Sequence, residues 1–276
     1  MPSDAATRDH APARYRLQPH QRDAATERRR LERDLALAVQ QGRLLLHYQP
    51  RIVLASGQTR AAEALVRWPH RTRGLVSPTL FIPLAEQSSL ILSIGGWVLR
   101  AACRQARQWQ RPWCVSVNVA ARQITSGALL GQVAAALEES GLPPERLELE
   151  LTESELIDVD AETLLALSAV RDLGVGLALD DFGSGHASLA VLRRLPLTVM
   201  KLDRSLLRDV PEHPEDTAVL RAVIALGHAL GLSVVAEGIE REPQRAFLSG
   251  CGCDEGQGYL FSQPLPPEQL AAQMAK

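Results

Sequence analysis

Residues 174–185 read GVGLALDDFGSG, an apolar run that ends in two acidic residues and a glycine-rich turn. The run Gly176–Leu179 is short and almost continuously apolar, which is typical of a strand buried on both faces of a parallel sheet. Such a sheet needs helices on its faces. Because Asp180 and Asp181 come directly after the run, we expect them at the carboxyl end of the strand.

Similar apolar runs, with helical patterns between them, lie on either side of this stretch. The runs are Leu44–Tyr48, Arg60–Val66, Cys114–Val119, Leu147–Leu151, Gly176–Leu179, Val199–Leu202, Ser233–Ala236 and Gly256–Phe261. The helical patterns include Leu80–Gln110, Leu129–Ser140, Ala161–Leu173, Thr217–Leu230 and Glu240–Leu248. This alternation indicates an α/β fold, and eight strands favour a closed (β/α)8 barrel over an open sheet. The pattern alone allows both architectures.

The first part of the chain differs from the rest. Residues 1–25 contain Pro, His and Arg without a period, which predicts a flexible leader. Residues 26–42 carry a helical pattern that ends at Gly42 and predict a linker helix. Residues 43–276 then form the barrel. Residues 1–34 hold eight arginines against six acids; such a tract could bind nucleic acid, but a solvated tail and helix face is the simpler interpretation.

Composition excludes several classes of protein. The 276 residues are 46% hydrophobic and 22% charged, with a formal net charge of -2. These values exclude a mostly disordered chain, a collagen and a coiled coil, and they give no sign of a basic nucleic-acid-binding surface or a polybasic membrane anchor. No apolar run reaches the roughly 18 residues of a membrane span. The four cysteines are irregularly spaced, which predicts reduced thiols and a cytoplasmic protein.

Polar side chains end or follow most of the apolar runs, where a barrel would bring them to one mouth. They are Glu63, Asn118, Glu150, Asp180, Asp181, Lys201, Glu237 and Gln257. A single acid in such a place is commonly a favourable charge at a helix N-terminus. Five carboxylates around one lysine, however, need cations to stay ionised together. Oxygen ligands without His or Cys indicate Mg²⁺ or Mn²⁺, and two such ions are the usual device for attacking a phosphodiester.

An ordered set of motifs extends this pattern over most of the chain. The motifs are Tyr48-Gln49-Pro50, Glu63-Ala64-Leu65-Val66-Arg67-Trp68, Phe81–Glu86, Val117–Gln123, Glu150–Ser154, Asp180–Gly185, Lys201–Ser205, Val235–Glu240 and Gln257-Gly258-Tyr259. From about Leu31 to Gln269 the chain closely resembles the EAL-domain cyclic-di-GMP phosphodiesterases, which are named after the triplet that here is Glu63-Ala64-Leu65.

The resemblance implies a TIM-like barrel whose first strand is antiparallel to the others. It implies metal-dependent hydrolysis of cyclic di-GMP to linear 5'-pGpG, which lowers the level of this second messenger in bacterial signalling. The implied ligands of two Mg²⁺ or Mn²⁺ ions are Glu63, Asn118, Glu150, Asp180, Asp181 and Glu237. Glu237, Lys201 and Glu63 are the catalytic candidates, and the general base stays open between assistance by Glu237 and by Lys201. The implied substrate contacts are Gln49, Arg67, Gln257 and Glu240.

The resemblance also implies a regulatory loop and a homodimer. The loop residues are Glu153, Gly183, Ser184, Gly185 and His186, and the dimer would form through the Asp181–Leu189 segment and the adjacent helix. The chain departs from the family pattern at four positions: Ala120 stands for serine, Ser184 for threonine, His186 for an aromatic residue and Gly256 for valine. The change at His186 puts the order of the loop and the packing of the dimer in doubt.

Two other functions compete with the enzyme. One is a receptor that holds cyclic di-GMP without cleaving it, but every expected ligand position carries the expected residue. The other is an interaction protein that contacts DNA or another protein, and the near-neutral charge disfavours DNA. The paired glycines Gly95-Gly96 are followed by Trp97 rather than by the acidic residues of a cyclase motif, so synthesis of cyclic di-GMP is not expected.

Overall fold

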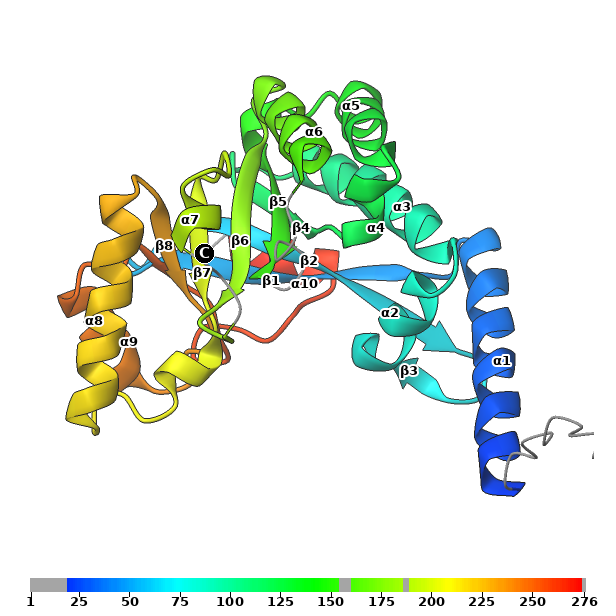
Figure 1. The fold of residues 1–276 in the computed structure, drawn as a ribbon, viewed down its shortest axis with the longest axis horizontal. Coiled ribbons are helices and arrows are strands. Elements are labelled where there is room, and N and C mark those ends of the chain that lie inside the picture. Colours follow the sequence, from blue (N-terminus) through cyan, green and yellow to red (C-terminus); the bar gives the residue numbers. More distant parts are fainter. Residues whose placement is uncertain (1–18, 154–159, 186–188, 275–276) are drawn as a thin grey trace, which may run out of the picture.

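The strands of this protein close into a barrel in a computed structural model that describes residues 19–153, 160–185 and 189–274. Within these ranges the strands are β1 Leu45–Val53, β2 Thr59–His70, β3 Gly74–Val76, β4 Cys114–Asn118, β5 Leu147–Thr152, β6 Gly176–Phe182, β7 Val199–Leu202, β8 Ser233–Ala236 and β9 Glu255–Gly256. Their order is β1-β9-β8-β7-β6-β5-β4-β2-β3, and a further pairing of β1 with β2 closes a ring of eight strands (Figure 1). An open sheet is thereby excluded.

The first strand runs against the others, as expected. Strand β1 is antiparallel to both of its neighbours, β2 and β9. The remaining pairings of the ring, from β2 through β4 to β9, are parallel. Strand β3 lies outside the ring and extends β2 as an antiparallel hairpin. The carboxyl ends of the seven parallel strands therefore meet at one mouth.

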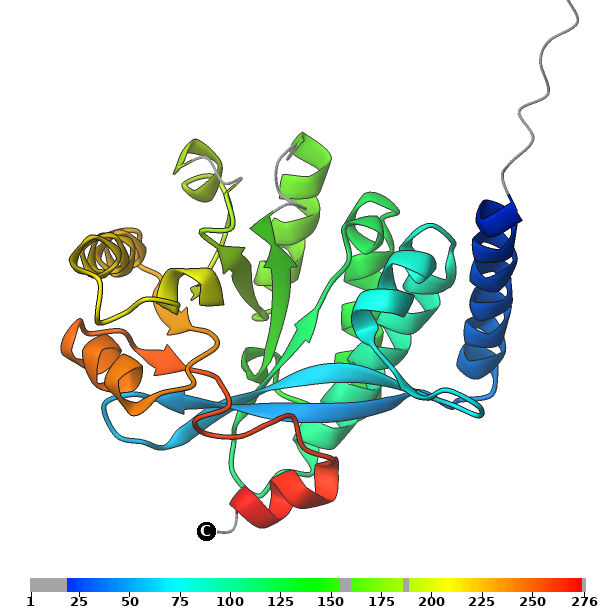
Figure 2. The ribbon, with the colours of Figure 1, turned by 90° about the horizontal axis from the view of Figure 1, so that it is seen from below.

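Helices cover the outside of the barrel (Figure 2). They are α1 Pro19–Gln40, α2 Pro78–Glu86, α3 Leu90–Arg107, α4 Ala121–Thr125, α5 Ala128–Ser140, α6 Ala161–Asp172, α7 Leu189–Leu192, α8 Pro214–Ala229, α9 Glu242–Gly250 and α10 Pro267–Met274, with short 3-10 turns at Pro144–Arg146 and Arg204–Leu207. None of these helices combines the length and the apolar character that crossing a membrane requires.

Three predicted boundaries were wrong. The single helix expected over Leu80–Gln110 is two helices, because the Ser88 hydroxyl donates to the Leu84 and Ala85 carbonyl oxygens at 3.2 and 3.1 Å and so ends α2. The linker helix begins at Pro19 rather than at residue 26. The last strand is only Glu255–Gly256, and a turn follows it. Residues 1–18 of the predicted leader lie outside the described part of the chain.

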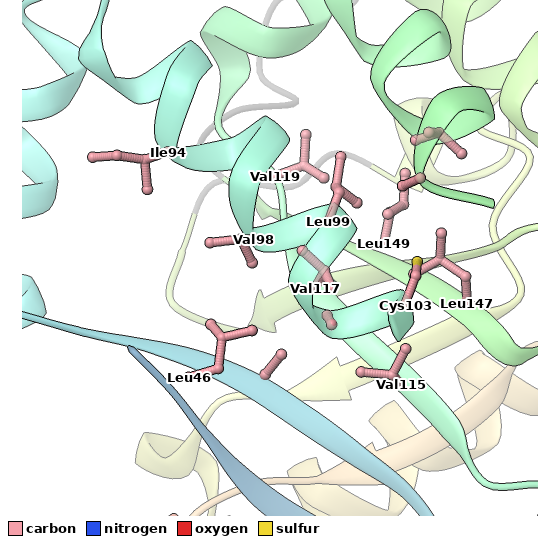
Figure 3. Packing of buried hydrophobic residues seen from close by; sticks show 14 of the residues in the cluster. Leu46, Ile94, Val98, Leu99, Cys103, Val115, Val117, Val119, Leu147 and Leu149 are labelled. Atoms are coloured by element: carbon pink, nitrogen blue, oxygen red, sulfur yellow. The ribbon is translucent and has the colours of Figure 1, made fainter. Parts of the chain in front are cut away.

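Apolar and polar side chains alternate along β4 and β5. On β5, Leu147, Leu149 and Leu151 are buried in the outer core, and Glu148 and Glu150 lie between them in the sequence. Strand β4 follows the same rule, and its valines pack against α3 (Figure 3). Successive side chains of a strand point to opposite faces. Polar side chains of these strands therefore face the interior of the barrel, and the larger apolar cores lie between the strands and the helices.

Helix α1 packs beside the barrel rather than around its mouth (Figures 1 and 2). Leu31, Leu35 and Ala38 are buried against the core that also includes residues of α2 and α3. The arginines at positions 28–30 are exposed on the other face of the helix. The apolar face predicted for this helix is thus confirmed, although the helix ends at Gln40 rather than at residue 42, and its charged side faces solvent.

Candidate functional site

A buried lysine lies at the centre of the acidic residues at the barrel mouth. The Lys201 Nζ atom is 2.7 Å from Glu237 Oε1, 2.9 Å from Glu150 Oε2 and 3.0 Å from Asp180 Oδ1. A fourth carboxylate, Glu63, is 4.0 Å away. The Lys201 side chain is completely buried, so the carboxylates must compensate its charge.

Amide side chains fix the orientation of Glu63. Asn118 Nδ2 donates to Glu63 Oε1 at 2.8 Å, and Gln257 Nε2 donates to Glu63 Oε2 at 2.6 Å. The same Gln257 nitrogen lies 3.1 Å from Gln49 Oε1, and Gln49 Nε2 donates to the Ser262 carbonyl oxygen at 3.1 Å. Asn118 and Gln257 both turn their amide nitrogens towards Glu63, so their amide oxygens are left for another partner. The oxygen of Gln257 is buried without a hydrogen-bond partner among the described residues.

The backbone at Asp181 is strained. Its φ is 56°, the only positive value among the described residues other than glycine. Its N–H donates to Asp180 Oδ1 at 3.0 Å. A left-handed conformation is costly for a residue with a side chain and persists where the surroundings require it. Here it brings the carboxylates of two consecutive residues to one side, since ligand oxygens of Asp180, Asp181 and Glu237 all lie within 4.8 Å of one another.

The carboxylates differ in how well they tolerate their charge. Burial raises the pKa of Glu237 to about 8 despite the nearby Lys201. Burial also raises the pKa of Glu150 well above its ordinary range and raises the pKa of Asp181, which Asp180 repels. Burial opposes ionisation of Glu63 too, but Lys201 and the two amides lower its pKa. One ammonium group therefore does not neutralise the cluster.

These residues fit divalent cations. The donor atoms are carboxylate and amide oxygens, which hard cations such as Mg²⁺ and Mn²⁺ prefer. The oxygens of Asp180, Asp181 and Glu237 are close enough to share an ion. The excess negative charge and the unpartnered Gln257 oxygen are what a bound cation would satisfy. The six predicted metal ligands thus lie at one mouth, and Lys201 lies among them.

Two cavities adjoin the cluster. One of about 240 Å³ is lined by Gln49, Glu63, Asp180, Glu237, Glu240 and Gln257, together with Arg204 and Tyr259. The other, of about 250 Å³, is lined by Arg67 and Asn118 and by apolar side chains of α2 and α3. All four predicted substrate contacts therefore line a cavity beside the acids, although Gln257 follows the last strand instead of lying in it.

Sequence reasoning missed two residues of the first cavity. Arg204 is exposed, and the Tyr259 side chain is 63% exposed at the mouth. Both lie within motifs that were recognised, one position after Asp203 and two positions after Gln257. An exposed aromatic ring beside buried acids was the available signal for Tyr259, but exposure is visible only in the structure.

The segment after β6 contacts Glu153. The Gly183 N–H donates to Glu153 Oε2 at 3.1 Å, and Ser184 Oγ lies 3.5 Å from the same oxygen. Gly183 and Gly185 have φ values of 101° and 121°, which favour glycine. His186 lies outside the described residues.

Comparison with known proteins gives one consistent family. The sequence profile of the EAL domain matches residues 32–264. The chain is 42% identical over 256 residues to the bifunctional diguanylate cyclase/cyclic di-GMP phosphodiesterase MucR of Pseudomonas aeruginosa, an alignment that spans 91% of this chain and 37% of MucR. It is 45% identical over 246 residues to the cyclic di-GMP phosphodiesterase NbdA of the same species, across 88% of this chain and 31% of NbdA.

Solved structures agree. The PaMucR phosphodiesterase in its c-di-GMP complex superposes with a TM-score of 0.83 at 41% sequence identity, and the match covers 87% of this chain and 99% of that chain. The present chain spans about a third of the length of the two curated relatives.

The strain at Asp181 predicts a gain in stability when the residue is replaced. In the presence of a chelator, Asp181→Asn should raise the free energy of unfolding by about 1 kcal/mol, because asparagine tolerates positive φ and removes a repelled charge. Asp181→Gly should stabilise the protein by a similar amount. The exposed Asp209→Asn is the control and should stay within about 0.5 kcal/mol. Urea unfolding measures all three, and a less stable Asp181→Asn protein would contradict the assignment of strain.

Proposed function

This chain belongs to the EAL domain family, and from that premise we propose that it is a metal-dependent phosphodiesterase. Its substrate is cyclic di-GMP, its product is linear 5'-pGpG, and its action lowers the level of this second messenger in bacterial signalling. The observation that carries the proposal is the set of carboxylates around Lys201, with Glu63 held in place by Asn118 and Gln257.

The proposed metal ligands are the residues that line the mouth. Two divalent cations, Mg²⁺ or Mn²⁺, would be held by Glu63, Asn118, Glu150, Asp180, Asp181 and Glu237. When bound, such cations polarise the phosphodiester and lower the pKa of the attacking water. The fixed amides keep the Glu63 carboxylate from rotating, and a ligand that is already oriented loses less entropy when it binds.

Lys201 and Glu237 have different proposed roles. The Lys201 ammonium forms ion pairs with three carboxylates, so it remains a cation and places positive charge beside the phosphate. The Glu237 side chain is 20% exposed, whereas those of Glu150 and Asp180 are 0% and 10% exposed. Glu237 is therefore the most exposed of these three carboxylates at the mouth. We assign it to take the proton from the attacking water.

The substrate would occupy the cavities beside the acids. Arg67 lines one cavity, and Gln49, Gln257 and Glu240 line the other. Since Glu63 and Asn118 lie between the two sets, a dinucleotide that spans both would place a phosphodiester over the acids. The glutamine and glutamate side chains offer donors and acceptors for bases and ribose.

Product analysis by chromatography tests the proposed reaction. Purified protein with Mg²⁺ or Mn²⁺ should convert cyclic di-GMP to 5'-pGpG, and chelator should stop the conversion. Glu63→Gln should lower the rate by at least about 100-fold, because it removes a charged ligand while keeping its shape. Glu138→Gln, at an exposed position of α5, is the matched control. Full activity of Glu63→Gln would refute the metal assignment, and ligand retention without any product would favour a receptor.

We also propose that Glu153 holds Gly183 and Ser184 in place and so affects cation binding by the neighbouring acids Asp180 and Asp181. Glu153→Ala should lower kcat and weaken Mg²⁺ binding about tenfold, because Gly183 and Ser184 lose their acceptor. Glu162→Ala, at the exposed first turn of α6, should leave both quantities unchanged. Titration calorimetry and initial rates measure the two effects, and an unchanged Glu153→Ala protein would remove the role.

A homodimer through the 181–189 segment and the adjacent α6 is a further part of the proposal. Leu165 on α6 and Leu189 at the end of the segment are 71% and 55% exposed, so each offers apolar surface to a partner. Leu165→Asp should convert dimer to monomer in sedimentation velocity. Leu75→Asp, at the 58% exposed position of β3, should not. A wild-type protein that stays monomeric at all concentrations would contradict the proposal.

We place this activity in the cytoplasm. All four cysteines are free thiols in the structure, as is usual for proteins of a reducing compartment.

A further inference from the structure

A second group of buried charges lies at the opposite end of the barrel interior. Arg51 Nη1 is 2.6 Å from Glu148 Oε1, and Arg51 Nε is 2.5 Å from Glu255 Oε2. The three side chains are between 3% and 6% exposed. Glu148 and Glu255 lie at the amino ends of β5 and β9, whereas the acid cluster lies at the carboxyl ends of the strands. We call Arg51, Glu148 and Glu255 the basal triad.

Each member of the basal triad lies two residues from a residue of the mouth. Arg51 follows Gln49 on β1, Glu148 precedes Glu150 on β5, and Glu255 precedes Gln257 at the end of β9. Side chains two residues apart on a strand point to the same face and are about 6.6 Å apart. The triad therefore lies directly below residues that orient Glu63 and contact Lys201.

One of these strands is very short. Strand β9 has only two residues, which pair with β1 on one side and with β8 on the other. Gln257, which orients Glu63, follows immediately. Arg51 ties this short strand to β1 through Glu255 and reaches across the interior to β5 through Glu148. The ion pairs thus link three strands that the mouth residues depend on.

Packing from below does not fix the triad. Arg51, Glu148 and Glu255 line a cavity of about 680 Å³ at this end of the barrel. Side chains beside a cavity have no neighbours on that side to hold them in place. Their positions therefore depend on the ion pairs.

Energetics argue against stability as the main role of the triad. Taking charges out of water is costly, and neutral side chains of similar volume often replace a buried ion pair without loss of stability. The advantage of charged partners is a defined geometry, because the two terminal nitrogens of the Arg51 guanidinium fork donate to the two oxygens of Glu148, at 2.6 and 3.4 Å.

We propose that the basal triad is a positioning device for the mouth, with Arg51 as its key residue. Through Glu255 it sets the position of Gln257 and hence of Glu63, and through Glu148 it sets the position of Glu150. The proposal rests on the proposed function, because its effect is read through cation binding at the acid cluster. Arg51 touches neither substrate nor cation and acts only through the strands.

The test removes the charges together so that none is left unpaired. The triple variant Arg51→Met, Glu148→Gln, Glu255→Gln should unfold in urea at or above the wild-type midpoint in the presence of chelator. Its dissociation constant for Mn²⁺, measured by titration calorimetry, should rise about tenfold, and kcat/KM should fall by a similar factor. Arg60→Met is the matched control, since Arg60 is 3.4 Å from Glu255 but 68% exposed.

A conservative variant keeps the test decisive if the triple variant does not fold. Arg51→Lys retains the charge but not the fork, so it should fold and still bind Mn²⁺ several-fold more weakly than wild type. Wild-type Mn²⁺ affinity in a folded triple variant or in Arg51→Lys would overturn the positioning role. Absence of both Mn²⁺ binding and hydrolysis in the wild-type protein would instead refute the proposed function and this inference with it.

Discussion

The burial of Lys201 among four carboxylates is the constraint on which the rest of the structure depends. An ammonium group without access to water is tolerated only where acceptors surround it. Glu150 on β5, Asp180 on β6 and Glu237 directly after β8 place carboxylate oxygens 2.7 to 3.0 Å from the Lys201 nitrogen. Because β7, which carries Lys201, pairs with β6 and β8, and β6 pairs with β5, the charge balance of the site depends on the correct order of these four strands.

The polar interior follows from this constraint. Barrels of this architecture are commonly filled by layers of branched apolar side chains. Here only a small apolar cluster of Ala178, Val199 and Val235 is buried apart from the two larger outer clusters. The acid cluster occupies one end of the interior and the basal triad the other. The outer core, between strands and helices, therefore supplies most of the apolar burial of the fold.

The architecture could be predicted from the sequence because the spacing of apolar residues indicates each strand and helix locally, and the number of strands then favours a barrel. It also predicted the composition of the mouth, since residues at strand ends converge in any barrel. It missed the break at Ser88, where a hydroxyl competes for helix carbonyls, because both flanking segments carry the same apolar period. It also missed the basal triad. The sequence shows Glu148 and Glu150 alternating with leucines on β5. The partner of Glu148, Arg51, is 97 residues away, and no local pattern connects the two.

The positive φ of Asp181 could not have been predicted from its neighbours, because most aspartates have negative φ and no local pattern marks this one as an exception. This backbone conformation lowers the stability of the fold, but it brings the Asp181 carboxylate beside those of Asp180 and Glu237, where the proposed function needs it. The same residue begins the segment that Glu153 contacts through Gly183. Any movement of that segment would therefore reach the acids directly.

The acids around Lys201 are proposed to form a cation site. Anomalous diffraction from crystals grown with Mn²⁺ can locate such a site, because the signal identifies the metal by element and position. We expect anomalous peaks bounded by the carboxylates of Asp180, Asp181 and Glu237 and by Glu63. Fully ordered acids at saturating Mn²⁺, with no peak at the mouth, would contradict it.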